Sequence, residues 1–196
     1  MESTSNASLL ALAKFSQYII LLSMQSYILI GYRGTGKTTV ARKLADRLTI
    51  PTFDSDVEIE RHAGKSIAEI FIQDGESVFR NIEESVIAEI LARSAPFVLA
   101  TGGGAILRKS TRERLRQSGR VIWLTATPEV ILRRITNDVA SQTMRPNLTS
   151  LPMQEEIVTV LEQRKPLYAE TAHEILDTDF HSTDEIVEII FTGSLP

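Results

Sequence analysis

The chain has 196 residues, enough for one α/β domain, and its 43% hydrophobic and 23% charged composition is typical of a soluble globular protein. Its formal net charge of −4 argues against general binding to nucleic acid, which favours a basic surface. Cysteine is absent, which excludes disulfides, thiolate nucleophiles and cysteine-based metal sites. We therefore expect a cytoplasmic protein that has no nucleic-acid partner.

Residues 1–23 form an extension of uncertain status ahead of the first clear strand pattern. Residues 9–24 are mostly apolar, but Lys14, Ser16 and Gln17 interrupt them. A helix of that length, at about 1.5 Å per residue, falls short of a bilayer core of about 30 Å, and no clear secretory signal is present. We expect no membrane partner and a single domain over residues 24–196. The extension is either a poorly specified segment from an upstream start codon or a short amphipathic helix packed on the domain.

The next segment carries a phosphate-binding pattern. Residues 27–39 read YILIGYRGTGKTT and match G-x-x-x-x-G-K-[ST], with Gly31, Gly36, Lys37 and Thr38 at the fixed positions. Apolar residues at 27–30 predict a buried strand, and helical spacing of the apolar residues after Lys37 predicts a helix. Glycines allow the loop between them to curl its N–H groups around a polyphosphate at the helix N-terminus.

In such loops the lysine reaches the β- and γ-phosphates and the hydroxyl after it ligates Mg²⁺. These are the expected roles of Lys37 and Thr38. The alternative is a glycine turn that only joins a strand to a helix. Because the pattern has its required strand–loop–helix context, we expect a nucleoside triphosphate to bind here.

Strand and helix patterns then alternate, which predicts a parallel sheet covered by helices on both faces. Short apolar runs predict strands at residues 51–53, 97–100, 121–124 and 174–176, and Trp123 is expected in the core. Capping boxes predict three helix starts, at Ser66 with Glu69, Ser110 with Glu113 and Ser182 with Glu185.

Other helix boundaries follow from glycine and proline. Gly75 breaks one helix before another over residues 76–93, and Thr127 caps a helix that has Pro128 at its first position. Residues 141–152 contain two prolines and several small polar residues, so a mobile loop is expected there, forming a lid around residues 141–154. The helix after this loop is expected to end near Arg164.

Asp54 and Asp56 follow the second predicted strand. Ligands of open α/β sheets gather at the carboxyl ends of the strands, so both carboxylates should face the phosphate-binding loop. Phosphoryl transfer uses one carboxylate near the metal and one that orients or deprotonates the acceptor hydroxyl. The alternative is that Asp54 or Ser55 only caps the next helix.

Several arginines and one run of glycines are further candidates. Arg80 and Glu83 lie three apart in a strongly apolar helical pattern, and they form either an exposed ion pair or an inward-facing guanidinium steered by a carboxylate. Gly102–Gly104 follow an apolar strand, which suits close approach of the backbone to a ligand. Arg145, in the predicted lid, and Arg164 are candidates for neutralising charge, although isolated arginines are more often solvated.

In this order the motifs resemble those of the shikimate kinase family of P-loop small-molecule kinases. The resemblance spans residue 27 to about residue 180. The matching segments are Gly34–Thr39, Phe53–Asp56, Ile59–Glu60, Gly64–Ile67, Gly75–Glu76, Phe79–Arg80, Glu83, Thr101–Gly104, Arg145–Pro146, Arg164 and Pro166–Tyr168. The lid departs from the usual pattern, because Asn147 stands where a leucine is common.

The resemblance implies an α/β fold of three layers, with a five-stranded parallel sheet in the order 2-3-1-4-5 and helices on both faces. It implies an enzyme that phosphorylates shikimate with ATP and Mg²⁺ in aromatic amino-acid biosynthesis, acting as a monomer. ATP would be held by Gly34, Thr35, Gly36, Lys37, Thr38, Thr39, Arg134, Arg145 and His181.

The resemblance also implies individual roles. Thr38 would ligate the metal and Asp54 would reach it through water, while Lys37, Asp56 and Arg145 would be the catalytic residues, with Asp56 as the base. Arg134 would pack on adenine, and residues 177–182 would line the base. Shikimate would be bound by Asp56, Arg80, Gly102, Gly103, Gly104 and Arg164, with Glu83 orienting Arg80. The alternatives are a kinase for another small hydroxy acid, such as gluconate, and a non-catalytic nucleotide-binding paralogue.

Overall fold

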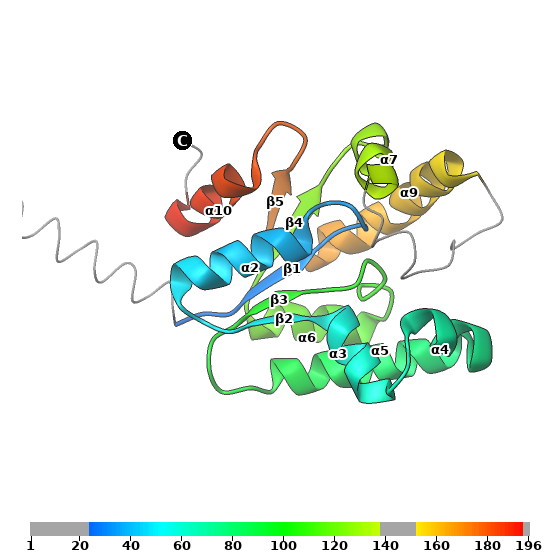
Figure 1. Cartoon of the computed structure of the whole chain (residues 1–196). Coiled ribbons are helices and arrows are strands. Elements are labelled where there is room, and N and C mark those ends of the chain that lie inside the picture. The colour runs from blue at the N-terminus through cyan, green and yellow to red at the C-terminus, as the bar shows by residue number, and fades with distance from the viewer. Residues whose placement is uncertain (1–23, 138–151, 194–196) are drawn as a thin grey trace, which may run out of the picture.

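The computed structural model describes residues 24–137 and 152–193. Residues 1–23 and most of the expected lid, Arg145 included, therefore lie outside the described residues. The described chain forms one five-stranded sheet whose neighbouring strands are all parallel, in the order β2-β3-β1-β4-β5 (Figure 1). This confirms the expected order. The strands are β1 (Tyr27–Ile30), β2 (Thr52–Asp54), β3 (Val98–Ala100), β4 (Arg120–Thr125) and β5 (Glu174–Asp177).

Helices cover both faces of the sheet, as the alternating pattern predicts. Figure 1 shows α2 and α10 on one side of the sheet and α3, α5 and α6 on the other. The helices are α2 (Lys37–Leu48), α3 (Ser55–Ala63), α4 (Ile67–Gln73), α5 (Gly75–Leu91), α6 (Lys109–Ser118), α7 (Pro128–Asn137), α9 (Met153–Thr171) and α10 (Thr183–Thr192).

The central strand β1 explains why the first apolar run has no polar interruptions. Its side chains alternate between the two faces, so that Tyr27 and Leu29 pack toward α2 and α10 while Ile28 and Ile30 pack toward the helices opposite. All four residues are fully buried. A central parallel strand is covered on both faces and must therefore be apolar on both. Its burial holds in place the strand end at which the next loop begins.

Two of the three expected capping boxes are confirmed, at Ser66 with Glu69 on α4 and at Ser182 with Glu185 on α10. The third is wrong, because α6 begins at Lys109 and has no side-chain cap. The Ser110 hydroxyl instead donates to the Glu84 carboxylate of α5 at 2.6 Å. A tertiary partner has thus replaced the local one.

The helix expected to end near Arg164 continues to Thr171 and contains Pro166. Packing beyond the proline accounts for the difference, because Tyr168 is fully buried and its ring stacks on Trp123, with centroids 5.3 Å apart. Trp123 is 7% exposed, which confirms its expected place in the core. Because α9 continues beyond the proline, Arg164 lies inside the helix, with packed residues both before and after it in the chain.

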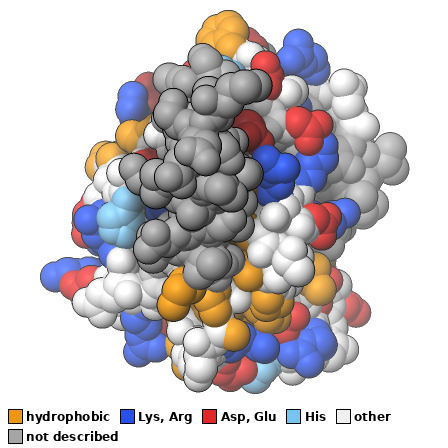
Figure 2. All heavy atoms as spheres, turned by 90° about the vertical axis from the view of Figure 1, so that its left-hand side faces the viewer, with side chains coloured by type: hydrophobic (Ala, Val, Ile, Leu, Met, Phe, Trp, Pro, Cys, Tyr) orange, Lys and Arg blue, Asp and Glu red, His pale blue; other side chains and the backbone are white. Residues whose placement is uncertain are grey.

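One face of the surface is shown in Figure 2. On its described part, acidic and basic side chains lie among one another rather than separating into surfaces of one sign. Within residues 24–137 and 152–193, no helix combines the length and apolar character needed to cross a membrane.

Candidate functional site

The phosphate loop, residues 31–36, joins the carboxyl end of β1 to α2. Gly31 has a φ of 143°, and a methyl group there would lie 2.4 Å from the Leu124 carbonyl oxygen, so only glycine fits. Gly36 is the N-cap of α2 in the left-handed region, with a φ of 85°, and makes no side-chain cap. The first N–H groups of α2 therefore face the inside of the loop without a capping side chain, which is the arrangement that binds phosphate at a helix N-terminus.

Lys37 and Thr35 close the phosphate loop on itself. The Lys37 ammonium and the Thr35 hydroxyl each donate to the Tyr32 carbonyl oxygen at 2.8 Å. Lys37 is only 8% exposed. The ammonium is thus held within the turn of the loop, where it adds positive charge to the helix N-terminus.

Thr38 and Asp54 meet at the end of β2, as the sequence pattern predicts. The Thr38 hydroxyl donates to Asp54 Oδ2 at 2.7 Å, while Asp54 Oδ1 accepts the Asp56 N–H at 3.0 Å and caps α3. One Asp54 oxygen therefore caps α3 and the other faces the phosphate loop, while a role of Asp54 toward a metal stays a prediction. A hydroxyl that donates its proton to a carboxylate keeps oxygen lone pairs for a metal, so the oxygen donors here fit Mg²⁺.

No cluster of three or more acidic, histidine or cysteine side chains that could enclose a metal occurs in the described part of the chain. Mg²⁺ in kinases is bound by one or two protein oxygens together with substrate phosphates, so a sparse site is what this chemistry needs. Thr38 and Asp54 offer oxygen donors of this kind.

Ser55 connects the start of α3 to the glycine loop, residues 101–104. It is fully buried, and its hydroxyl accepts the Gly102 N–H at 2.8 Å. This bond places Asp56, the next residue, where α3 and the glycine loop adjoin. The sequence interpretation of Ser55 as a possible cap missed this role, since its partner lies 47 positions away along the chain.

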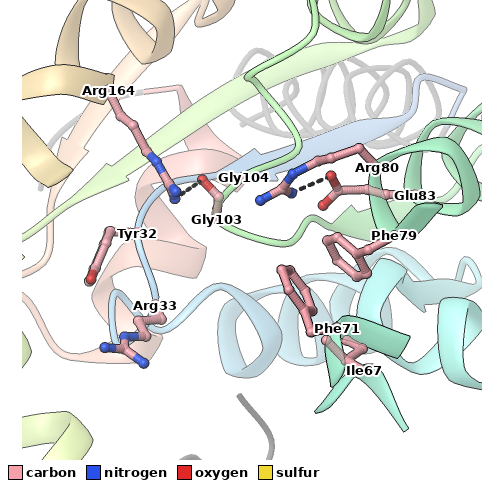
Figure 3. Close-up of a pocket in the computed structure, with 10 residues that line it drawn as sticks. All are labelled: Tyr32, Arg33, Ile67, Phe71, Phe79, Arg80, Glu83, Gly103, Gly104 and Arg164. Atoms are coloured by element: carbon pink, nitrogen blue, oxygen red, sulfur yellow. Dashed lines mark hydrogen bonds and ion pairs between the residues drawn. The ribbon is translucent and has the colours of Figure 1, made fainter. Parts of the chain in front are cut away.

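Beside the phosphate loop lies an open hollow, here called the arginine pocket (Figure 3). Its lining combines three arginines and one carboxylate with three aromatic rings. The lining residues are Tyr32, Arg33, Ile67, Phe71, Phe79, Arg80, Glu83, Gly103, Gly104 and Arg164.

Arg80 is held by two carboxylates of its own helix, α5. One terminal nitrogen donates to Glu83 at 2.6 Å, and Nε and the other terminal nitrogen donate to Glu76 at 3.2 and 3.1 Å. The Arg80 and Glu83 side chains are 11% and 5% exposed, so the interpretation as an exposed ion pair is wrong. A guanidinium fixed in this way presents a preoriented fork of donors to a ligand carboxylate.

The glycine loop lies between Arg80 and Arg164, which approach it from opposite sides (Figure 3). The Gly103 carbonyl accepts hydrogen bonds from Arg164 at 3.0 Å and from the Tyr168 hydroxyl at 2.6 Å. A methyl group on Gly104 would lie 2.4 Å from a terminal nitrogen of Arg80. The absence of side chains in this loop therefore allows the two guanidinium groups to converge.

Arg134 of α7 joins the phosphate loop to the segment after β5. Its guanidinium donates to the Gly34 carbonyl at 3.3 Å and to both the hydroxyl and the carbonyl of Thr178, at 2.8 and 2.6 Å. Residues 177–182, which include the half-buried His181, are thereby fixed beside the phosphate loop. Contact of Arg134 or His181 with a nucleotide base stays a prediction.

The sequence interpretation missed two pocket residues, Tyr32 and Arg33, and the buried Glu156 that pairs with Arg33. Arg33 donates to the Glu156 carboxylate of α9 at 2.8 Å, and both residues lie beside Tyr32. Burial raises the pKa of the Tyr32 hydroxyl, an effect that the positive charge of Arg33 partly opposes. A possible signal was the charge of Arg33 itself, at a position that the phosphate-loop pattern leaves unspecified.

The chain is similar to known proteins over most of its length. A family model described as shikimate kinase matches residues 33–192. A shikimate kinase of Rhodopirellula baltica is 42% identical over 163 residues, which cover 83% of this chain and 87% of the relative. One of Syntrophus aciditrophicus is 43% identical over 176 residues, which cover 85% and 89%.

A solved structure is also similar, that of shikimate kinase from Acinetobacter baumannii in complex with shikimate. It has a TM-score of 0.81 and 36% sequence identity to this chain, and the match covers 91% of this chain and 99% of that one. Sequence and fold thus agree over nearly the whole described chain. The chain belongs to the shikimate kinase family.

Proposed function

We propose that this enzyme transfers the γ-phosphoryl group of ATP to the 3-hydroxyl of shikimate, giving ADP and shikimate 3-phosphate in aromatic amino-acid biosynthesis. One observation carries the proposal, namely that the arginine pocket and the phosphate loop share a wall. A methyl group built on Gly103 would lie 3.4 Å from the Gly31 carbonyl oxygen and 3.5 Å from the backbone nitrogen of Arg33. An acid bound at Gly103 therefore lies next to bound phosphates.

Arg80 and Arg164 bind the shikimate carboxylate in this proposal. Glu83 and Glu76 orient the Arg80 fork, while Arg164 is placed by the Gly103 carbonyl. Because both guanidinium groups are oriented before the ligand arrives, little side-chain entropy is lost on binding. Gly102–Gly104 bring backbone groups close to the ring hydroxyls.

The nucleotide is bound by residues 34–39, and Thr38 and Asp54 would hold Mg²⁺. When bound, this ion offsets the negative charge of the phosphates. Lys37 adds a buried positive charge at the same place. Arg134 and residues 177–182, including His181, contact the base, and Arg145, outside the described residues, neutralises charge on the phosphates.

Asp56 is the proposed acceptor of the 3-hydroxyl proton. Its position directly after the buried Ser55, next to the glycine loop, places it between the two binding regions. It orients the hydroxyl for in-line attack and takes up its proton as the bond to phosphorus forms.

Two alternatives are less supported, a kinase for another hydroxy acid such as gluconate and a non-catalytic nucleotide-binding paralogue. The decisive measurement is ADP release with shikimate, with gluconate and without an acid, on the purified chain. We expect ADP release to depend on shikimate and to give shikimate 3-phosphate. Slow release that no acid accelerates would favour the non-catalytic paralogue, and acceleration by gluconate alone would overturn the choice of substrate. The same preparation also tests the expected monomer by its mass in solution.

A further inference from the structure

Arg33 brings a charge into the wall that the phosphate loop and the arginine pocket share. Arg33 lines the pocket, and its guanidinium donates to Glu156 at 2.8 Å, with the two side chains 14% and 1% exposed. Arg33 Nε is buried and has no hydrogen-bond partner within residues 24–137 and 152–193. The pair is thus largely removed from water, and one edge of the guanidinium is left without a described acceptor.

The proposed reaction changes the charge of the acid at this wall. Shikimate and shikimate 3-phosphate share one carboxylate, but the product also carries a phosphoryl group with a charge of about −1.5 to −2. That group arises at the phosphate loop, where Arg33 is located. The buried Glu156 carboxylate offsets the Arg33 charge, so that the wall does not hold the product by a strong unbalanced attraction.

We propose that Arg33 and Glu156 form a specificity-determining pair that sets the preference of the pocket between the acid and its phosphorylated product. The inference rests on the proposed function. Arg80, Glu83 and Arg164 also line the pocket, Lys37 bonds the Tyr32 carbonyl, and Asp56 follows Ser55, which bonds Gly102. Their charges act on both ligands and are unchanged in the variants below. The measured quantity is therefore the ratio of two dissociation constants, that for shikimate divided by that for shikimate 3-phosphate.

Calorimetric titration of both ligands into the wild type and into Glu156→Gln tests the pair. Removing the carboxylate leaves the Arg33 charge uncompensated, and at an effective dielectric constant near 20 the ratio should rise about tenfold or more. Stronger inhibition by product should accompany this rise, and salt should weaken the effect. An unchanged ratio in Glu156→Gln overturns the proposal.

A double variant separates charge from packing. Replacing Arg33 and Glu156 together by methionine keeps the wall neutral and apolar, a change that buried ion pairs often tolerate. Its ratio should stay within about twofold of the wild type. A rise equal to that of Glu156→Gln would show that packing, not charge, governs the ratio.

The Arg120–Glu174 pair offers a matched control. It is also partly buried, with side chains 18% and 38% exposed, and it joins the first residues of β4 and β5, at the end of the sheet opposite the phosphate loop. Glu174→Gln should leave the ratio unchanged. A rise in this variant would mean that any lost carboxylate has the same effect, which contradicts the inference.

If Glu156→Gln does not fold, Arg33→Met tests the opposite sign. The Glu156 carboxylate then lacks the opposing Arg33 charge and repels the phosphoryl group of the product, so the ratio should fall several-fold. An unchanged ratio there overturns the proposal equally. Measurements on the wild type distinguish a failure of this inference from a failure of the proposed function. If shikimate accelerates ADP release but the ratio does not respond to Glu156, only the pair is refuted. If shikimate neither binds nor accelerates ADP release, the proposed function falls and this inference falls with it.

Discussion

The phosphate loop and the arginine pocket adjoin at Gly103 but are built in different ways. The phosphate loop is local in sequence, and its shape depends on backbone conformation at Gly31 and Gly36 and on the uncapped start of α2. The arginine pocket is assembled from α4, α5, α9 and two loops, and its polar groups are held by side-chain ion pairs. Phosphate recognition thus depends on a backbone geometry that few other residues could adopt. Acid recognition depends instead on charged side chains, which the backbone restricts less.

The difference has a chemical reason. A polyphosphate offers many oxygens, so a row of backbone N–H groups at a helix N-terminus matches it. A small acid offers one carboxylate, and strong binding then needs a fork of charged donors fixed in the correct orientation. Substrate choice within this fold should therefore depend mainly on the pocket.

The largest effect is expected where the two regions join. Asp56→Asn keeps the size of the side chain but removes the base, and kcat should fall by about 10²–10⁴. Binding of ATP, measured by calorimetry, should stay within a few-fold of the wild type because the phosphate loop is unchanged. A variant with full activity would falsify the role of Asp56. Asp74→Asn, at the cap between α4 and α5, is a control in which kcat should stay high.

A smaller effect is expected from Arg80→Lys, which changes the pocket alone. Lysine keeps the charge but cannot reproduce the hydrogen bonds to Glu76 and Glu83 together with a fork for the ligand. Loss of charge-assisted hydrogen bonds should weaken shikimate binding about 10- to 100-fold. Titration with shikimate and with ATP checks this, since ATP affinity should hardly change. Equal losses for both ligands would mean that the two regions are not separately built.

The sequence predicts the phosphate loop almost completely, because each fixed position answers a local requirement. It also predicts the strand order, through the family resemblance, and the position of Asp54 facing the phosphate loop, through the rule that ligands gather at carboxyl ends of strands. The sequence did not predict the role of a residue where that role depends on a partner that is distant along the chain. Arg33 and Glu156 are separated by 123 positions, and Glu156 by pattern is an ordinary acid in the first turn of a helix.

The same cause explains the two errors in the helices. Ser110 has the spacing of a cap, but Glu84 of another helix takes its hydroxyl. Pro166 has the character of a helix end, but Tyr168 beyond it finds both a ring to stack on and the Gly103 carbonyl. In each case the local preference contributes less free energy than the tertiary contact that opposes it.

Gly104→Ala should act on the pocket more mildly than Arg80→Lys. The added methyl would lie within 2.4 Å of an Arg80 nitrogen, and the flexible guanidinium must move away. The KM for shikimate should rise about tenfold, as for one charge-assisted hydrogen bond, while the KM for ATP and the melting temperature stay close to the wild type. Steady-state kinetics with each substrate varied in turn provides the test. A rise confined to the KM for ATP would contradict the assignment of Gly104 to the pocket.

The smallest effects should come from the two confirmed capping boxes, and they compare the regions directly. Ser66 caps α4, which gives Ile67 and Phe71 to the pocket, whereas Ser182 caps α10 at the end of the segment expected to line the nucleotide base. Replacing either serine by alanine should cost about 1 kcal/mol of stability, measured by urea unfolding.

The kinetic consequences should differ although the stability losses match. Ser66→Ala loosens the first turn of α4 and should raise the KM for shikimate a few-fold, leaving the KM for ATP unaltered. Ser182→Ala should do the reverse, because Arg134 ties the neighbouring Thr178 to the phosphate loop and not to the pocket. If each variant changed both constants by the same factor, the two regions would respond as one unit, and the separation between backbone-built and side-chain-built recognition would not hold.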